Sequence, residues 1–240
     1  MDGHREPPFD PAAELARIRA ATDRLLRTAA RLSDADVRAP SLLPGWSRGH
    51  VLTHLARNAD GGRRLLTWAR TGVRTPEYPG PAEREAEIEA GAGRGAAELL
   101  ADLRASAAAF EAEYRRMPPG AWRHPVRWMR GQERPASQAA HARRCEVLVH
   151  HVDLDAGFTP AQWPPDFTRA MLARVAAAFA ARPDTPAVRL RATDTGAAHD
   201  LGAAGPRAPL ARAPQHVLLA WLMGRAPAPG PGLPEPPFLY

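Results

Sequence analysis

The sequence predicts a mainly α protein, a helical bundle followed by a small α+β domain. Two observations lead to this prediction. Apolar residues recur at helical spacing over the first two thirds of the chain, and alternating apolar and polar residues appear only beyond Phe158, at Val188 to Thr193. A chain of 240 residues suits one large domain or two small ones. We expect the bundle in residues 1–157 and the α+β domain, with a Pro/Gly-rich tail, in residues 158–240.

The first two helices of the bundle are indicated by apolar stripes and by the break between them. Leu and Ile side chains keep a helical stripe from Pro11 to Leu32. Pro44 and Gly45 belong to the break that follows, and Ser47 is the expected N-cap of the second helix, whose apolar side extends to Trp68.

Two more helical stretches complete the bundle. After a proline-containing loop, one long helical stretch is expected from Ala82 to Met117, bent at the glycines of residues 91–95. An irregular segment then leads to Pro135, and a fourth helix is expected from Ala136 to about Asp155. The interior of such a bundle is where facing helices build metal sites.

The smaller domain is predicted from a change in character after Phe158. A linker rich in proline precedes a helix capped by Asp166, and Gly196 permits a turn after the strand at Val188 to Thr193. Two further elements are expected: a returning strand within His199–Ala203 and a helix over Gln215–Met223. Beyond Arg225 the chain is rich in proline and glycine and is expected to be extended.

Charge and composition exclude several classes of function. The net charge is +6, yet all 32 basic residues are arginine, they are spread along the chain near acidic residues, and no five like charges adjoin. We therefore expect no nucleic-acid partner. No run approaches eighteen apolar residues, so no membrane span is expected. The single cysteine and the acidic first residues, which lack a signal-peptide stretch, favour a cytoplasmic location.

Several His and carboxylate residues are spaced four apart and so share a helix face. These pairs are His50 with His54, His141 with Cys145, and Glu146 with His150. Taken alone, each pair could be an ordinary polar contact.

Two of these residues stand out because their neighbours are apolar. Glu146 precedes Val147, Leu148 and Val149, and a carboxylate inside such a helix needs a partner. His54 is similarly embedded, whereas His50 is expected to face solvent. One cation held by His54, Glu146 and His150 would satisfy all three groups, and a catalytic zinc site needs three protein ligands with one open position. For Cys145, a buried inert thiol is favoured over a nucleophile, because no orienting base is evident.

The motifs together resemble those of a known family, the mycothiol-dependent maleylpyruvate isomerases within the wider DinB-like group of thiol-dependent metalloenzymes. The resemblance spans nearly the whole chain and rests on the order and spacing of four segments. They are Leu43–Ser47 leading to His54-Leu55-Ala56, Arg84–Glu89 with Arg94, Glu146–Leu154, and Trp221–Arg225. It implies a DinB-like four-helix bundle followed by a small α+β domain.

The resemblance also implies a ligand set and a thiol cosubstrate. The family's metal ligands fall on His54, Glu146 and His150, and its functional arginine falls on Arg84. A divalent metal, zinc first, and mycothiol are the implied cofactors. The ordinary alternative for Arg84 is a surface ion pair with Glu87 or another nearby carboxylate.

The implied reaction converts maleylpyruvate to fumarylpyruvate. A thiolate adds to the alkene, the resulting single bond rotates, and elimination leaves the trans isomer. Arg84 would bind a substrate carboxylate and stabilise the enolate, and Arg225 could do the same, with a structural pairing as its alternative. Asp153 would orient a ligand or contact the thiol, unless it is a plain helix-end carboxylate.

Two other functions are compatible with the same residues. One is a mycothiol S-transferase that conjugates the thiol to electrophilic metabolites or xenobiotics. The other is a non-catalytic metal-binding or regulatory protein. The expected partners are a small substrate and a low-molecular-weight thiol, and the sequence makes no prediction about the oligomeric state.

Overall fold

The computed structural model describes residues 9–237 of the chain. The chain forms two compact units, Met1–Ala156 and Gly157–Tyr240. The first is helical apart from one short hairpin, and the second combines helices with a small sheet, which confirms the predicted fold class. No helix within residues 9–237 is long and apolar enough to cross a membrane.

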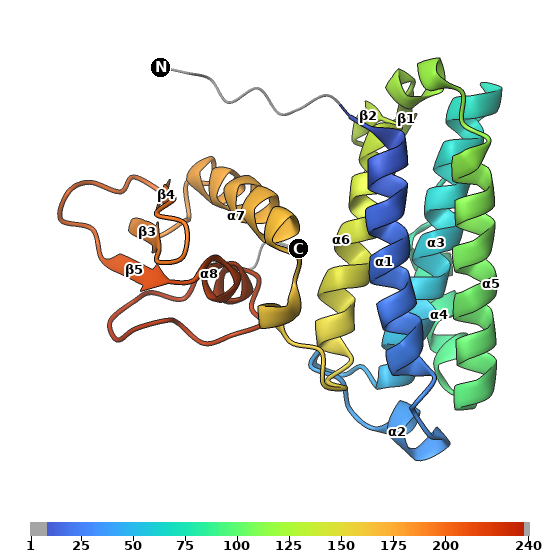
Figure 1. The fold of residues 1–240 in the computed structure, drawn as a ribbon, viewed down its shortest axis with the longest axis horizontal. Coiled ribbons are helices and arrows are strands. Elements are labelled where there is room, and N and C mark those ends of the chain that lie inside the picture. Colours follow the sequence, from blue (N-terminus) through green and yellow to red (C-terminus); the bar gives the residue numbers. More distant parts are fainter. Residues whose placement is uncertain (1–8, 238–240) are drawn as a thin grey trace. The chain divides into compact units, whose positions relative to one another are not determined.

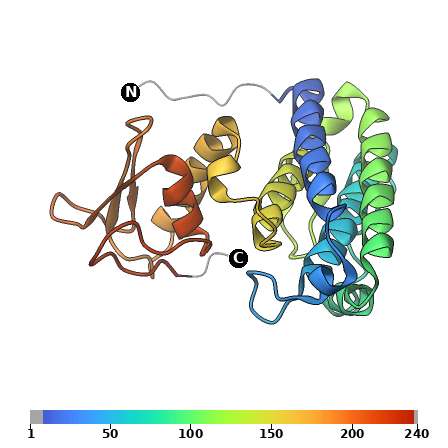
Figure 2. The same cartoon turned by 60° about the horizontal axis from the view of Figure 1, so that its bottom comes forward.

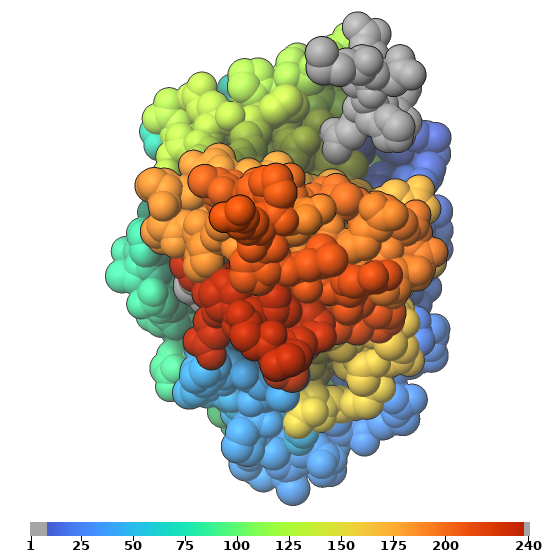
Figure 3. Space-filling model, turned by 90° about the vertical axis from the view of Figure 1, so that its left-hand side faces the viewer, coloured from blue at the N-terminus to red at the C-terminus, as the bar shows by residue number. Residues whose placement is uncertain are grey.

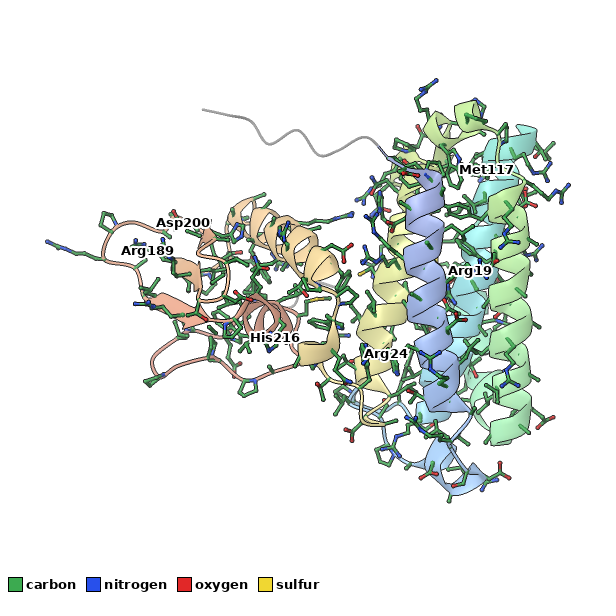
Figure 4. All side chains as sticks on the ribbon, viewed as in Figure 1. Arg19, Arg24, Met117, Arg189, Asp200 and His216 are labelled. Atoms are coloured by element: carbon green, nitrogen blue, oxygen red, sulfur yellow. The ribbon has the colours of Figure 1, made fainter. Side chains whose placement is uncertain are left out.

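Four long helices lie side by side in the first unit (Figures 1 and 2). They are α1 (Pro11–Ala29), α3 (Arg48–Thr71), α5 (Ala96–Arg115) and α6 (Ser137–Asp153). Each buries its apolar stripe in a common core, where side chains such as Leu25, Leu66 and Phe110 are at most 1% exposed. Burying a side chain of this size stabilises the fold by about 1.5–3 kcal/mol. Arg19 and Arg24 project from α1 on the surface of the bundle (Figure 4).

The long helix expected from Ala82 to Met117 is two helices, α4 (Pro81–Ala92) and α5. The chain turns between them at the glycines near Arg94, where glycine weakens a helix. The new helix start is capped from outside, because Asp34 Oδ1 accepts a hydrogen bond from the Ala96 amide at 2.8 Å. A bend in one helix was therefore the wrong prediction.

Three short pieces of regular structure lie where the sequence suggested breaks or irregular chain. They are α2 (Asp34–Arg38), the 3-10 helix Pro119–Arg123, and a hairpin of β1 (Pro125–Arg127) and β2 (Glu133–Pro135). The first begins at a capping box between Ser33 and Asp36, whose side chains accept from each other's backbone amides. Elements of three to five residues are too short to show a period.

Helix α4 approaches α3 closely at two glycines. A Cβ atom on Gly49 would collide with the backbone carbonyl oxygen of Ala92, and one on Gly91 would collide with the Thr53 side chain. Since α4 carries Arg84, these two glycines fix how near that arginine lies to α3.

The second unit is built around a three-stranded sheet of order β4-β3-β5. Its elements are the 3-10 helix Pro160–Gln162, α7 (Pro165–Ala180), β3 (Val188–Ala192), β4 (Ala198–Leu201), β5 (Leu210–Ala213) and α8 (Gln215–Leu222). Strand β3 pairs antiparallel with β4, as the turn at Gly196 predicts, and parallel with β5, which the sequence analysis missed. Asp166 lies in the first turn of α7, whose N-cap is Pro164 rather than Asp166.

The sheet has one buried and one exposed face. Residues alternate between buried and exposed along β3, and α7 and α8 pack against the sheet. The exposed face carries Arg189 and, opposite it in register, Asp200 (Figure 4). Residues 226–237 contain no helix or strand. Figure 3 shows the red segments of this unit, which include this tail, next to its orange segments on one continuous face. Part of this tail and the end of α8 line a hollow of about 250 Å³.

Candidate metal centre

Three side chains from two helices converge inside the first unit. His54 comes from α3, and Glu146 and His150 come from α6. Glu146 Oε2 lies 2.8 Å from His54 Nε2 and 3.3 Å from His150 Nε2. One possible ligand atom from each residue lies within 4.8 Å of the other two. The structure therefore brings together the three residues that the sequence singled out.

The start of α3 is fixed by a reciprocal cap between Ser47 and His50. Ser47 Oγ accepts from the His50 amide, and the Ser47 amide donates to His50 Nδ1 at 3.1 Å. His50 Nε2 also lies 3.1 Å from a carboxylate oxygen of Glu89. His50 was expected to face solvent, but its ring belongs to the cap. One turn further along α3, His54 is buried with 5% of its surface exposed.

The C-terminal end of α6 is tied to the region where α3 begins. Arg48 donates hydrogen bonds to the carbonyl oxygens of Leu154 and Asp155, at 2.6 and 2.8 Å. The Leu42 amide donates to the Asp153 carbonyl at 2.9 Å. These carbonyls lack partners within the helix, and a cation at a helix C-terminus also complements the helix dipole. These hydrogen bonds fix the end of α6 against the start of α3, so that His150 lies beside His54.

Burial and hydrogen bonding divide the charge unequally among the three groups. Burial lowers the pKa of His54 to about 4, so its imidazole is neutral. Burial alone would raise the pKa of Glu146, but hydrogen bonds from His150 and His54 outweigh it and hold that pKa well below its usual value. For His150, burial is outweighed by its bonds to Asp153 and Glu146, which raise its pKa to about 9.

Asp153 holds the second ring nitrogen of His150. Its Oδ2 lies 2.8 Å from His150 Nδ1, and the residue is fully buried. A carboxylate on one imidazole nitrogen keeps a proton there and leaves the other nitrogen free as a ligand. Asp153 therefore pairs with one of the three converging residues, and its role in orienting a ligand stays a prediction.

Arg84 reaches His54 from the other side. Its Nη2 donates to His54 Nδ1 at 3.0 Å, and its guanidinium carbon lies 5.6 Å from the centre of the Tyr78 ring. Arg84 forms no ion pair with Glu87 or any other carboxylate among residues 9–237, so the surface-pair alternative does not hold. Burial raises the pKa of Tyr78 to about 12, against a smaller opposing effect of the nearby Arg84 charge.

Two residues near the site were missed by sequence reasoning. Tyr78 comes from a loop with no periodic signal, and Arg143 is one arginine among many. Arg143 is 2% exposed, and its Nη1 donates to the Leu55 carbonyl and to Asn58 Oδ1, at 2.8 and 2.9 Å. Arg143 thus links α6 to α3 next to the candidate ligand His54. Nothing in its local sequence distinguishes Arg143 from the arginines on the surface.

The remaining candidates lie in other surroundings. His141 Nδ1 is 3.3 Å from Glu14 Oε1, which is the ordinary polar contact. Cys145 is partly exposed, not buried as expected. Arg225 belongs to the second unit, where its Nη1 donates to the Met223 carbonyl at 2.6 Å. That is the structural pairing considered for Arg225, and a substrate contact stays a prediction.

The donor set suits a divalent ion. Two imidazole nitrogens and a carboxylate oxygen are ligands that zinc accepts, and three protein ligands leave a further position for another molecule. Both histidines direct Nε2 toward the shared Glu146 oxygen. A cation there would replace the protons that the histidine nitrogens now share with the carboxylate. The residues therefore fit such an ion.

Comparison with known proteins adds an independent finding. Residues 18–155 match the model of the mycothiol maleylpyruvate isomerase N-terminal domain. Crystal structures of the mycothiol-dependent maleylpyruvate isomerase and of a histidine-to-alanine mutant are each 26% identical to this chain. Their TM-scores are 0.89 and 0.88, and the matches cover 96% of this chain and 98% of theirs. No curated protein matches by sequence. Because the matched domain spans more than half of the chain, the chain belongs to the enzyme family of the mycothiol maleylpyruvate isomerases.

Proposed function

We propose that this protein is a mycothiol-dependent metalloenzyme that isomerises maleylpyruvate, or a related unsaturated keto acid, to the trans isomer. The observation that carries the proposal is the convergence of His54, Glu146 and His150 beside a guanidinium, in a chain of this family. Such a set can hold a divalent ion and an anionic substrate next to each other.

His54, Glu146 and His150 would hold the ion, zinc being the first choice. A bound zinc ion favours the thiolate form of a thiol at neutral pH. Asp153 keeps the proton of His150 on Nδ1 and directs Nε2 to the site. Arg84 supplies a fixed positive charge, and its planar donor pair matches a carboxylate.

The reaction needs no redox partner, because substrate and product are isomers. It consumes no thiol, because the thiolate that adds is later expelled. The thiolate sulfur forms a bond to the alkene carbon β to the ketone, and the π electrons move through the carbonyl group to give an enolate on the ketone oxygen. The former double bond rotates as a single bond. The enolate then re-forms the double bond in the trans arrangement and expels the thiolate. Arg84 would bind a substrate carboxylate and stabilise the negative charge of the enolate.

The first experiment measures metal content and turnover in the same preparations. We expect about one divalent ion per chain in the wild type and in His141→Ala, and none in His54→Ala. His141 is the matched control because it lies on α6 but pairs with Glu14. Maleylpyruvate should be converted only when mycothiol is present.

The products separate the alternatives. A trans isomer formed without loss of mycothiol supports the proposal, whereas a stable thiol conjugate would identify an S-transferase. Metal uptake with no reaction of the thiol toward any electrophile would favour a binding or regulatory role. Absence of metal in the wild type after incubation with zinc would refute the proposed mechanism.

A further inference from the structure

The contact between Arg84 and His54 fixes which nitrogen of His54 carries the proton. A guanidinium has donors and no acceptor, so Nδ1 of His54 must accept the hydrogen bond from Arg84. The proton of the neutral ring is therefore on Nε2, where it is donated to Glu146 Oε2 at 2.8 Å. The two contacts agree with one tautomer.

This tautomer is incompatible with ligation through Nε2. Nε2 is the nitrogen that faces the other two ligand residues. To bind a metal it must offer its lone pair, and the proton of a neutral imidazole then sits on Nδ1. An N–H at Nδ1 would point at the N–H of Arg84, 3.0 Å away. Two donors cannot form a hydrogen bond, so Arg84 and the metal compete for the same ring.

Arg84 also contacts Tyr78, and metal binding to His54 does not affect this second contact. The guanidinium carbon lies 5.6 Å from the centre of the Tyr78 ring, within range of a cation–π contact. Tyr78 is itself held, since only 6% of it is exposed and its ring packs over Gly61. A Cβ atom at Gly61 would lie 3.1 Å from Tyr78 Cζ.

We propose that His54 binds Arg84 only while His54 is not a metal ligand, and that Tyr78 positions the released guanidinium for a substrate carboxylate. The inference rests on the proposed metal site at His54. It makes Tyr78 a positioning residue, which acts through Arg84. It also means that the arginine becomes available for an anion in the metal-loaded protein.

The test is the zinc affinity of Arg84 variants, measured by competition with a chromogenic chelator. Zinc binding to the wild type must break the Arg84–His54 hydrogen bond, so Arg84→Met should bind zinc about tenfold more tightly. Arg84→Gln should do the same, because its amide oxygen can accept from Nδ1. A merely structural role for Arg84 would change the affinity in the opposite direction, since a loosened site binds zinc more weakly.

Arg94→Met is the matched control. Arg94 follows α4, and its Nη2 donates a hydrogen bond to Asp102 at 2.7 Å. Its replacement by methionine removes the same charge as Arg84→Met at a residue that contacts no candidate ligand. Its zinc affinity should stay within about twofold of the wild type. Thermal unfolding of each metal-free variant checks that it is folded.

The Tyr78 part has its own readout. Tyr78→Leu should raise KM for the keto acid with little change in zinc affinity, and Tyr78→Phe, which keeps the ring, should raise KM less. Equal KM values in Tyr78→Leu and the wild type would overturn the role of Tyr78.

The outcomes distinguish this inference from the proposed function. If the wild type takes up no divalent ion, both fail. If the wild type binds zinc but Arg84→Met binds it no more tightly, the proposed function stands and the competition between Arg84 and the metal is refuted.

Discussion

Replacing Gly49 by alanine should separate the two helices that bring Arg84 to His54. Gly49 is buried near the start of α3, where that helix meets the end of α4. An added Cβ would collide with the carbonyl oxygen of Ala92 and lie 3.3 Å from its carbonyl carbon and 3.4 Å from the carbonyl oxygen of Val37. All three are backbone atoms, so no side-chain rotation relieves the overlap.

Two opposing effects set the magnitude. Overpacking costs about 1–3 kcal/mol, and the upper part of that range applies because backbone must move. Alanine in place of glycine in a helix returns up to about 1 kcal/mol. The net loss is about 2 kcal/mol in the free energy of unfolding, or roughly 4–8 °C in Tm for a chain of this length.

The measurement is thermal and urea unfolding of Gly49→Ala beside Gly93→Ala, both without metal. Gly93 has a φ of −80°, and no atom lies within 4 Å of the position that an added Cβ atom would take. Gly93→Ala should therefore be neutral or more stable by up to about 1 kcal/mol. Turnover by Gly49→Ala should also fall, because α4 carries Arg84. A Gly49→Ala variant as stable as the wild type would refute the close-contact argument.

Three further outcomes follow from the same structure. Asp153→Asn should weaken zinc binding about 10–100-fold, because His150 loses its carboxylate partner. Asp155→Asn, two residues further along, should leave the zinc affinity unchanged, and equal zinc affinities of Asp153→Asn and the wild type would contradict this prediction. Zinc at a hundredfold excess over its Kd should raise the unfolding free energy by about 2.7 kcal/mol in the wild type but not in His54→Ala, as a Tm shift in differential scanning calorimetry would report. The third outcome concerns buried Glu14: burial raises its pKa, but His141, Arg144 and Arg17 together lower it below the usual value. Its ionised form therefore stabilises the fold above about pH 4, and that contribution is lost as the pH falls through the lowered pKa; Glu14→Gln should show a shallower loss of stability on acidification in urea titrations.

The long helices and the candidate ligands were predictable because they follow from periodicity and burial. The stripes around Leu25 and Leu66 need a common core, and a carboxylate such as Glu146 among apolar neighbours needs a partner. Helix ends were less predictable. The start of α5 is capped both locally, by Glu98 on the Gly95 amide, and by the Asp34 side chain on the Ala96 amide from 62 positions away. No local pattern contains the second contact.

The surroundings of the ligands were out of reach for a similar reason. Tyr78 lies in a loop, and its contact with Arg84 depends on the space left by Gly61. Arg143 is indistinguishable in sequence from the surface arginines, since only the packed bundle shows that it is buried. His50 was misread because its role, a reciprocal cap with Ser47, uses a ring nitrogen in place of the usual carboxylate.

The separation of the ligand residues along the chain has a consequence for biosynthesis. His54 and Glu146 are 92 positions apart, and α4 and α5 lie between them. During translation, His54 emerges long before its partners, and a lone histidine cannot retain zinc against the chelators of the cell. If the proposed site binds zinc, the metal would be acquired only after α6 has joined the bundle, and any variant that slows the docking of α6 should accumulate as metal-free protein.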